Sequence, residues 1–112
     1  MDLELKGKTV IVTGGASNIG RAISLQFAKE GSNVVIADWD EPMAQKTLGE
    51  LKALGGKVST IKTDVTSWES VQAMVKKTLG DYGQIDVLVN NAAWGRDRLF
   101  TEKPRGEWEK EI

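Results

Sequence analysis

The feature that most constrains the fold is a strand pattern that runs through a loop of small residues into a helical pattern. Thr9–Thr13 is short, apolar and rich in β-branched residues, and the loop Gly14–Asn18 follows it. One helix face is then predicted by apolar residues at helical spacing: Ile19, Ala22, Ile23 and Phe27. A helix N-terminus carries unpaired backbone N–H groups and partial positive charge, and small residues let a phosphate approach them. The stretch therefore predicts a phosphate cradle.

Composition narrows the classes of protein that fit this cradle. The chain has 112 residues, the size of one domain or part of one, and its 15 basic and 16 acidic residues nearly balance. Bulk charge gives no reason to expect a nucleic-acid or membrane partner, and no apolar run approaches the roughly 20 residues of a membrane span. With no Cys and no His, the chain offers no thiolate nucleophile, imidazole base or ordinary transition-metal site. The lack of Cys and of a signal peptide fits a cytoplasmic protein.

Three further strand patterns alternate with helices along the chain. The strands are expected at Asn33–Ala37, Lys57–Lys62 and Ile85–Val89. Asn33–Ala37 is short and apolar throughout, as expected when helices cover both faces of a sheet. The helices are expected from Ile19 to Glu30, after Asp40-Glu41-Pro42, and after Thr66. Alternating strands and helices imply parallel pairing through right-handed crossovers. The predicted fold is α/β, a β-α-β-α-β-α-β portion of a doubly wound sheet.

Several residues predict where the helices begin and end. Gly31 is a natural stop for the first helix, and Asp40 with Pro42 is typical of a helix start. Thr66 with Glu69 has the spacing of a capping box for the third helix. Core-facing residues are predicted at helical spacing in the second and third helices: Ala44, Leu48 and Leu51, then Val71, Met74, Val75 and Leu79.

Asp38 ends the second strand, 18 residues after Gly20. In a dinucleotide site, a carboxylate at this place accepts hydrogen bonds from the adenosine ribose hydroxyls. It would also repel a 2′-phosphate, and neither Ser17 nor Trp39 supplies a basic side chain to bind one, so NAD is expected rather than NADP. The alternative is that Asp38 only caps the next helix, although Asp40 is better placed to do so.

Three motifs in this order, Thr13–Gly20, Asp64-Val65 and Asn90-Asn91-Ala92-Ala93, resemble those of the classical short-chain dehydrogenase/reductase family. The resemblance covers the whole chain and implies a three-layer Rossmann-like sheet with strand order 3-2-1-4. It also implies the cofactor-binding residues: Gly14, Ser17, Asn18 and Ile19 along the pyrophosphate and ribose, Asp38 for NAD, Asp64 and Val65 at the adenine, and Asn91 beside the path to the nicotinamide. Asn90 is expected to serve the sheet's own hydrogen bonding.

Two positions depart from the family pattern. Asn18 replaces the middle glycine of the loop, and since Asn tolerates unusual backbone angles, we expect the loop to keep its shape. Ala93 replaces the glycine that usually follows Asn-Asn-Ala, a small change at that turn.

No catalytic residue can be assigned in the sequence. The family uses a Tyr-x-x-x-Lys pair with a Ser and an Asn, whereas the sole tyrosine, Tyr82, is followed four residues later by Asp86 and is interpreted as structural. Residues 1–112 are therefore expected to be an incomplete NAD-binding portion whose catalytic part is absent. Its fourth strand would leave an apolar edge, so we expect the 112 residues alone to be marginally stable or self-associating.

The resemblance implies an NAD-dependent oxidoreductase that interconverts a secondary alcohol and a ketone. The segments Trp94–Phe100 and Gly106–Trp108 are similar to 3-oxoacyl-carrier-protein reductases and hydroxyacyl-CoA dehydrogenases, which suggests an acyl thioester as the small-molecule substrate. Trp94 and Phe100 either line a substrate cleft or pack under the next helix. A homo-oligomer is expected for the full-length protein. The alternative is a non-catalytic dinucleotide-binding or interaction module complete at this length.

Overall fold

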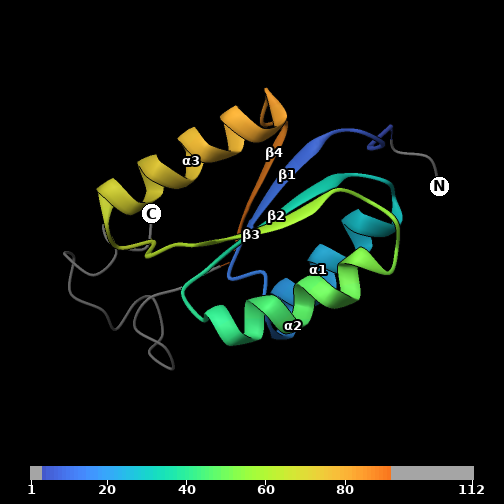
Figure 1. Ribbon diagram of the computed structural model, residues 1–112, viewed down its shortest axis with the longest axis horizontal. Coiled ribbons are helices and arrows are strands. Elements are labelled where there is room, and N and C mark those ends of the chain that lie inside the picture. The colour runs from blue at the N-terminus through green and yellow to red at the C-terminus, as the bar shows by residue number, and fades with distance from the viewer. Residues whose placement is uncertain (1–3, 92–112) are drawn as a thin grey trace, which may run out of the picture.

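The computed structural model describes residues 4–91, and in them strands and helices alternate along the chain (Figure 1). The elements are β1 (Thr9–Thr13), α1 (Asn18–Lys29), β2 (Asn33–Asp38), α2 (Glu41–Lys52), β3 (Val58–Lys62), α3 (Trp68–Tyr82) and β4 (Val87–Asn90). The strands form one parallel sheet in the order β3-β2-β1-β4. This confirms the predicted Rossmann-like fold and its strand order.

The helices lie on both faces of the sheet, which gives three layers. α1 and α2 cover one face and α3 covers the other (Figure 1). Right-handed crossovers require this arrangement, because the chain moves from β1 to β3 in one direction and then returns across the sheet to β4. All the helices start at the edge where the parallel strands end, so this edge gathers the loops that can bind a ligand.

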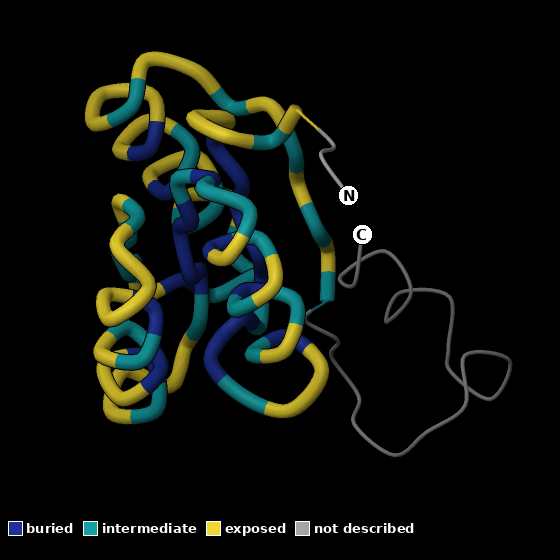
Figure 2. The backbone as a smooth tube through the Cα atoms, turned by 90° about the vertical axis from the view of Figure 1, so that its right-hand side faces the viewer, coloured by how far each residue is buried: buried dark blue, intermediate teal, exposed yellow. Residues whose placement is uncertain are grey.

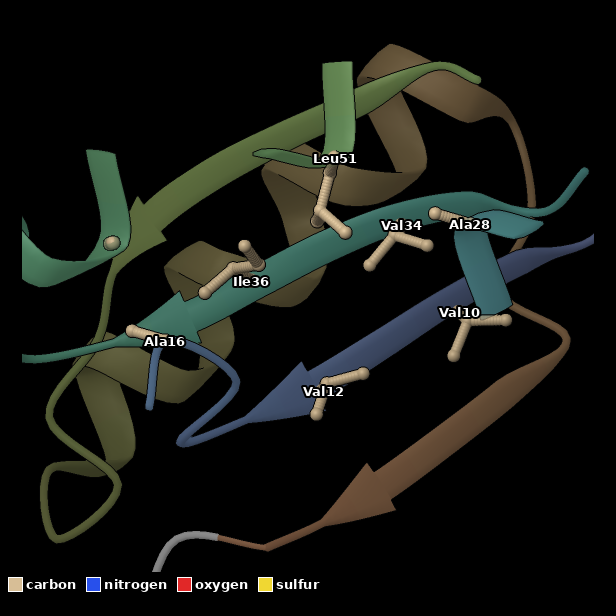
Figure 3. Packing of buried hydrophobic residues seen from close by; sticks show 8 residues of the cluster. Val10, Val12, Ala16, Ala28, Val34, Ile36 and Leu51 are labelled. Carbon is tan, nitrogen blue, oxygen red and sulfur yellow. The ribbon is translucent and has the colours of Figure 1, made fainter. Parts of the chain in front are cut away.

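The two faces of the sheet form separate apolar cores. Alternate residues of the central strands, among them Val10, Val34 and Ile36, pack against Ala28 of α1 and Leu51 of α2 (Figure 3). The residues between them face α3: Ile11, Val35 and Ala37 pack with Met74. β1 is buried throughout and β2 nearly so. Continuous burial of these strands provides the rigid support on which the loops at their ends rest.

The helix ends agree with the sequence at some positions and differ at others. Gly31, at φ +83°, follows α1, and its N–H donates to the Ala28 carbonyl in a Schellman motif, as predicted for a glycine stop. Asp40 caps α2 as expected, accepting the Met43 N–H at 3.1 Å. The predicted capping box at Thr66 is wrong, because Ser67 caps α3 by accepting the Ser70 N–H.

The buried face of α1 agrees with the predicted one only in part. Ile23 and Phe27 are partly buried and pack against the core as predicted, whereas Ile19 is 70% exposed and Ala22 is exposed. The fully buried residues are small ones, four positions apart: Gly20, Ser24 and Ala28. Their small side chains let the helix backbone lie close to β1 and the glycine loop.

In α3, Met74 is buried and Val71 and Val75 pack against the core, but Leu79 is exposed. Thr78 takes the buried position in place of Leu79, with its hydroxyl donating to the Met74 carbonyl at 2.8 Å. This bond within the helix pairs the hydroxyl, so it can be buried. The α3 part of the predicted core is therefore right except at Leu79.

β4 lies at an edge of the sheet, and its residues alternate between partly buried and exposed (Figure 2). Val87 and Val89 pack against the α1 side of the core, whereas Leu88, level with Ile11 on the α3 side, is 60% exposed. Within residues 4–91, no strand pairs with the outer side of β4. None of the helices in this part of the chain is long and apolar enough to cross a membrane.

Candidate functional site

The loop between β1 and α1 depends on glycine at three positions. Gly14 has φ +64° and donates its N–H to the Ala37 carbonyl at 2.8 Å, which turns the chain at the end of β1. A Cβ on Gly20 would collide with the Gly14 carbonyl oxygen. A Cβ on Gly15 would lie 2.9 Å from both Ser24 Oγ and the Val12 carbonyl oxygen. The glycines therefore allow a tight turn and close contact between loop and helix.

The first turn of α1 has no cap of its own. Ser17 is the N-cap residue in an extended conformation, but its side chain accepts no capping hydrogen bond, and the first turn contains no acidic residue. Asn18 has φ +53°, an unusual backbone angle that Asn tolerates, as expected. Ser17 is partly exposed and both Asn18 and Ile19 are exposed. The N-terminus of α1 is thus a partly exposed helix end with partial positive charge and no side-chain cap.

Two side-chain hydroxyls donate hydrogen bonds to carbonyls of the loop and of the start of α1. Neither was predicted from the sequence. Ser24 is fully buried, with its hydroxyl 2.9 Å from the Gly20 carbonyl and 3.2 Å from the Gly15 carbonyl. Thr47, from α2, donates its hydroxyl to the Ala16 carbonyl. The four-residue spacing of Ser24 from Gly20 was a usable signal for Ser24. Thr47 lies 31 residues from Ala16, and no local pattern connects the two.

Asp38 lies against the glycine loop at the end of β2. Its Oδ2 accepts the Ala16 N–H at 3.1 Å, and its Oδ1 accepts the Asp40 N–H at 2.9 Å. Asp40, rather than Asp38, is the cap of α2. The alternative that Asp38 only caps this helix is therefore wrong. The Asp38 carboxylate is half-buried and borders the phosphate cradle.

The end of β4 is hydrogen-bonded to the end of β1 and to the start of the same loop. The Thr13 hydroxyl lies 3.1 Å from Asn90 Oδ1 and accepts the Asn91 N–H at 2.9 Å. The Asn91 side chain donates from Nδ2 to the Gly14 carbonyl at 3.2 Å. Asn90 thus serves the hydrogen bonding of the sheet, as expected, and Asn91 lies beside the turn that begins the cradle.

Asp64 and Val65 follow β3 and are partly buried. The Thr63 N–H donates to the Asp38 carbonyl at 3.1 Å, which places this segment next to the end of β2. The Thr66 hydroxyl and N–H donate to Asp64 Oδ1 at 2.6 and 2.9 Å, and these bonds lower the pKa of the Asp64 carboxyl. These bonds favour the ionised form of Asp64, which follows β3 at the same edge of the sheet as Asp38.

The basic residue in the first turn of α1 is already paired. The Arg21 guanidinium makes an ion pair with Glu50 of α2, which raises the pKa of Arg21 and lowers that of Glu50. Since Gly14–Gly20 contains no charged residue, the charge that the cradle offers an anion comes from backbone N–H groups.

Tyr82 lies away from the glycine loop. Tyr82 ends α3 at the opposite edge of the sheet, where its hydroxyl lies 3.0 Å from Ser59 Oγ and its ring packs with the α3 core, as expected for a structural residue. Ala92, Ala93, Trp94 and Phe100 lie outside the described residues. No group of three or more His, Cys, Asp or Glu within residues 4–91 could hold a metal ion.

The chain resembles proteins that carry this loop and sheet. The sequence profile of short chain dehydrogenases matches residues 8–112. An uncharacterized oxidoreductase of Thermotoga maritima is 45% identical over 108 residues, 96% of this chain and 42% of that protein. A 3-oxoacyl-(acyl-carrier-protein) reductase of the same organism is 37% identical over 110 residues, 98% of this chain and 45% of that protein. The chain belongs to the short-chain dehydrogenase family.

Solved structures of the family share the fold described above. The NAD⁺-bound xylitol dehydrogenase superposes with a TM-score of 0.81 at 30% identity, over 96% of this chain and 42% of that one. A hydroxysteroid dehydrogenase from Escherichia coli gives a TM-score of 0.81 at 32% identity, over 95% of this chain and 45% of that one. The chain spans less than half the length of these relatives and neighbours.

Proposed function

We propose that this chain supplies the cofactor site of an NAD-dependent oxidoreductase that interconverts a secondary alcohol and a ketone. One observation carries the proposal: the first turn of α1 is uncapped, and the Asp38 carboxylate lies hydrogen-bonded against the loop that precedes it. An open helix N-terminus suits a pyrophosphate, and a neighbouring carboxylate suits the ribose of the same dinucleotide.

In the proposed complex, the first-turn N–H groups of α1, together with Gly14, Ser17, Asn18 and Ile19, bind the pyrophosphate and its adjacent ribose. Each Asp38 oxygen already accepts one backbone N–H, and a carboxylate has about four lone-pair sites. Capacity therefore remains for the ribose hydroxyls. A 2′-phosphate would bring further negative charge to this carboxylate, which favours NAD over NADP.

Asp64 and Val65 border the proposed adenine position, and Asn91 borders the path toward the nicotinamide. Asn91 holds the Gly14 carbonyl, so it orients the turn on which the pyrophosphate would rest. Bound NAD supplies a hydride acceptor, and its reduced form a hydride donor. The residues described here bind and orient that group.

The substrate and the proton-transferring residues belong to the whole protein. Residues 1–112 contain no Tyr-x-x-x-Lys pair, so we place the proton-transferring Tyr and Lys in the remainder of a longer enzyme. The T. maritima relative named 3-oxoacyl-(acyl-carrier-protein) reductase supports an oxoacyl or hydroxyacyl thioester as substrate. The names of the relatives and neighbours also favour an oxidoreductase over a non-catalytic module.

Titration calorimetry with NAD and NADP on the full-length protein and its Asp38→Ala variant tests the proposal. The unchanged protein should bind NAD at least about tenfold more tightly than NADP, a difference of about 1.4 kcal/mol in binding free energy. The Asp38→Ala variant should lose that preference. Asp40→Ala is the matched control, because Asp40 caps α2 instead of touching the loop. An unchanged preference in Asp38→Ala would show that another residue selects the cofactor.

A further inference from the structure

An exposed aromatic ring lies next to the proposed ribose position. Trp39 directly follows Asp38 and is 64% exposed. The Nζ atom of Lys62 lies 4.3 Å from the centre of a Trp39 ring, within the range of a cation–π contact. Lys62 ends β3, and its Cα is the register partner of Asp38 on β2. Two neighbouring strands thus place a carboxylate, an indole and an ammonium group together at the carboxyl edge of the sheet.

The contact with Lys62 distinguishes Trp39 from a surface tryptophan that merely projects into solvent. In residues 4–91 the ion pairs are Arg21–Glu50 and Lys77–Asp81, so Lys62 takes part in neither and lies on the indole instead. An ammonium group over the ring restricts the side chain of Trp39 while leaving most of its surface open. A held, open aromatic surface is suited to stacking against a flat ligand.

We propose that Trp39 is the platform on which the adenine base of the dinucleotide stacks, and that Lys62 is a positioning residue that holds the indole. The proposal rests on the proposed function, since it uses the ribose position at Asp38. The base is bonded to the same ribose whose hydroxyls would meet Asp38, so it must lie close to the residues that adjoin this carboxylate. Among Trp39, Asp64 and Val65, only Trp39 offers an aromatic face.

The contributions of Trp39 and Lys62 should differ in kind. Trp39 contacts the base itself, and stacking of one base on an aromatic side chain corresponds to roughly a tenfold or larger effect on affinity. Lys62 acts through the orientation of the ring, so a residue that keeps a cation over the indole should replace it. Arg does so readily because its guanidinium stacks on aromatic faces, whereas Met has similar length and no charge.

Binding of ADP-ribose and of nicotinamide mononucleotide to the full-length protein tests the platform. Trp39→Ala should weaken ADP-ribose about tenfold or more and leave nicotinamide mononucleotide, which has no adenine, unchanged. Trp39→Phe should keep most of the affinity. Lys62→Met should weaken ADP-ribose and Lys62→Arg should restore it. Trp68→Ala is the matched control, because Trp68 is 70% exposed on α3 and should not affect either ligand.

A spectroscopic signal separates stacking from a general loss of structure. ADP-ribose should quench tryptophan emission in the unchanged protein and in Trp68→Phe, but not in Trp39→Phe. Equal ADP-ribose affinity in Trp39→Ala and the unchanged protein would overturn the platform and leave the proposed function standing. Failure of the unchanged protein to bind ADP-ribose would overturn both.

Discussion

The helices begin at the same edge of the sheet, yet their N-termini differ in chemistry. α2 is capped by the Asp40 side chain and α3 by the Ser67 side chain, and each has an acidic residue, Glu41 or Glu69, in its first turn. α1 has neither a side-chain cap nor a first-turn acid. The α2 and α3 N-termini are satisfied within the protein, whereas that of α1 is left open beside a loop fixed by hydrogen bonds from other elements.

The difference between these helix N-termini distinguishes groups that stabilise a helix from groups that remain available to bind a ligand. Side-chain caps typically contribute about 1 kcal/mol to helix stability, and an acid in the first turn adds to this through the helix dipole. α1 has neither contribution. Its position is secured instead by close backbone contact at Gly20 and by the hydroxyls of Ser24 and Thr47. An N-terminus held in place but not satisfied is preorganised for an external anion.

The largest expected effect comes from adding one methyl group where α1 meets its loop. In Gly20→Ala the new Cβ would collide with the Gly14 carbonyl, which should cost about 3 kcal/mol or more of stability and abolish dinucleotide binding. Gly49→Ala in α2 is the control, since a Cβ there meets nothing and should stabilise the helix by about 0.5–1 kcal/mol. Urea unfolding and NAD titration measure both, and similar results for the two variants would contradict the close-contact argument.

A smaller effect should follow when α1 is given an acidic N-cap like that of α2. Ser17→Asp places a carboxylate at the N-cap, where it should raise the stability of the protein by about 0.5 kcal/mol and weaken NAD on the order of tenfold through repulsion of the pyrophosphate. Asp40→Ala should lower stability by about 1 kcal/mol and leave NAD affinity unchanged. Calorimetric titration and thermal melts of the two variants measure affinity and stability separately. Unchanged NAD affinity in Ser17→Asp would place the pyrophosphate elsewhere.

The smallest effect concerns Thr66, whose hydroxyl binds Asp64 and does not cap α3. Thr66→Val should raise the pKa of the Asp64 carboxyl toward its usual value, because its strongest hydrogen-bond donor is lost. Since the folded pKa is depressed, the stabilisation is present above the unfolded pKa of about 3.9 and is lost as pH falls through the folded pKa.

NMR titration of the Asp64 carboxyl carbon measures this shift directly. The stability difference between Thr66→Val and the unchanged protein should be present near neutral pH and disappear in acid. Ser67→Ala is the control, since it removes the α3 cap and should lower stability by about 1 kcal/mol without raising the Asp64 pKa. An equal pKa in Thr66→Val and the unchanged protein would show that the hydroxyl is not the cause.

The sequence predicted features that depend on local chemistry. β1 has the predicted bounds, and Gly31 and Asp40 act as the predicted stop and cap. Such features are readable because one residue and its immediate neighbours determine them. The cap of α3 was misplaced by one residue because Thr66 and Ser67 both have hydroxyls, and the spacing to Glu69 favoured the wrong one. The Thr66 hydroxyl instead binds Asp64, two residues before it, and Ser67 becomes the cap.

The features that sequence reasoning missed depend on contacts between distant segments. The buried face of α1 is set by how near the helix lies to the sheet, so Gly20 and Ser24 displaced the larger Ile19. Thr47 and the ring contact between Lys62 and Trp39 join residues 31 and 23 positions apart. The site residues predicted from motifs are gathered at one edge of the sheet, while several of the groups that hold them there carry no motif.

In the proposed complex the open N-terminus of α1, and not that of α2 or α3, receives the pyrophosphate. Backbone amide chemical shifts of the full-length protein, recorded before and after addition of ADP-ribose, test it most directly. We expect the largest shifts in the loop and first turn of α1, at residues 14–20, with small ones at residues 41–44 and 68–71. Largest shifts in the first turn of α2 or α3, or none at residues 14–20, would contradict it.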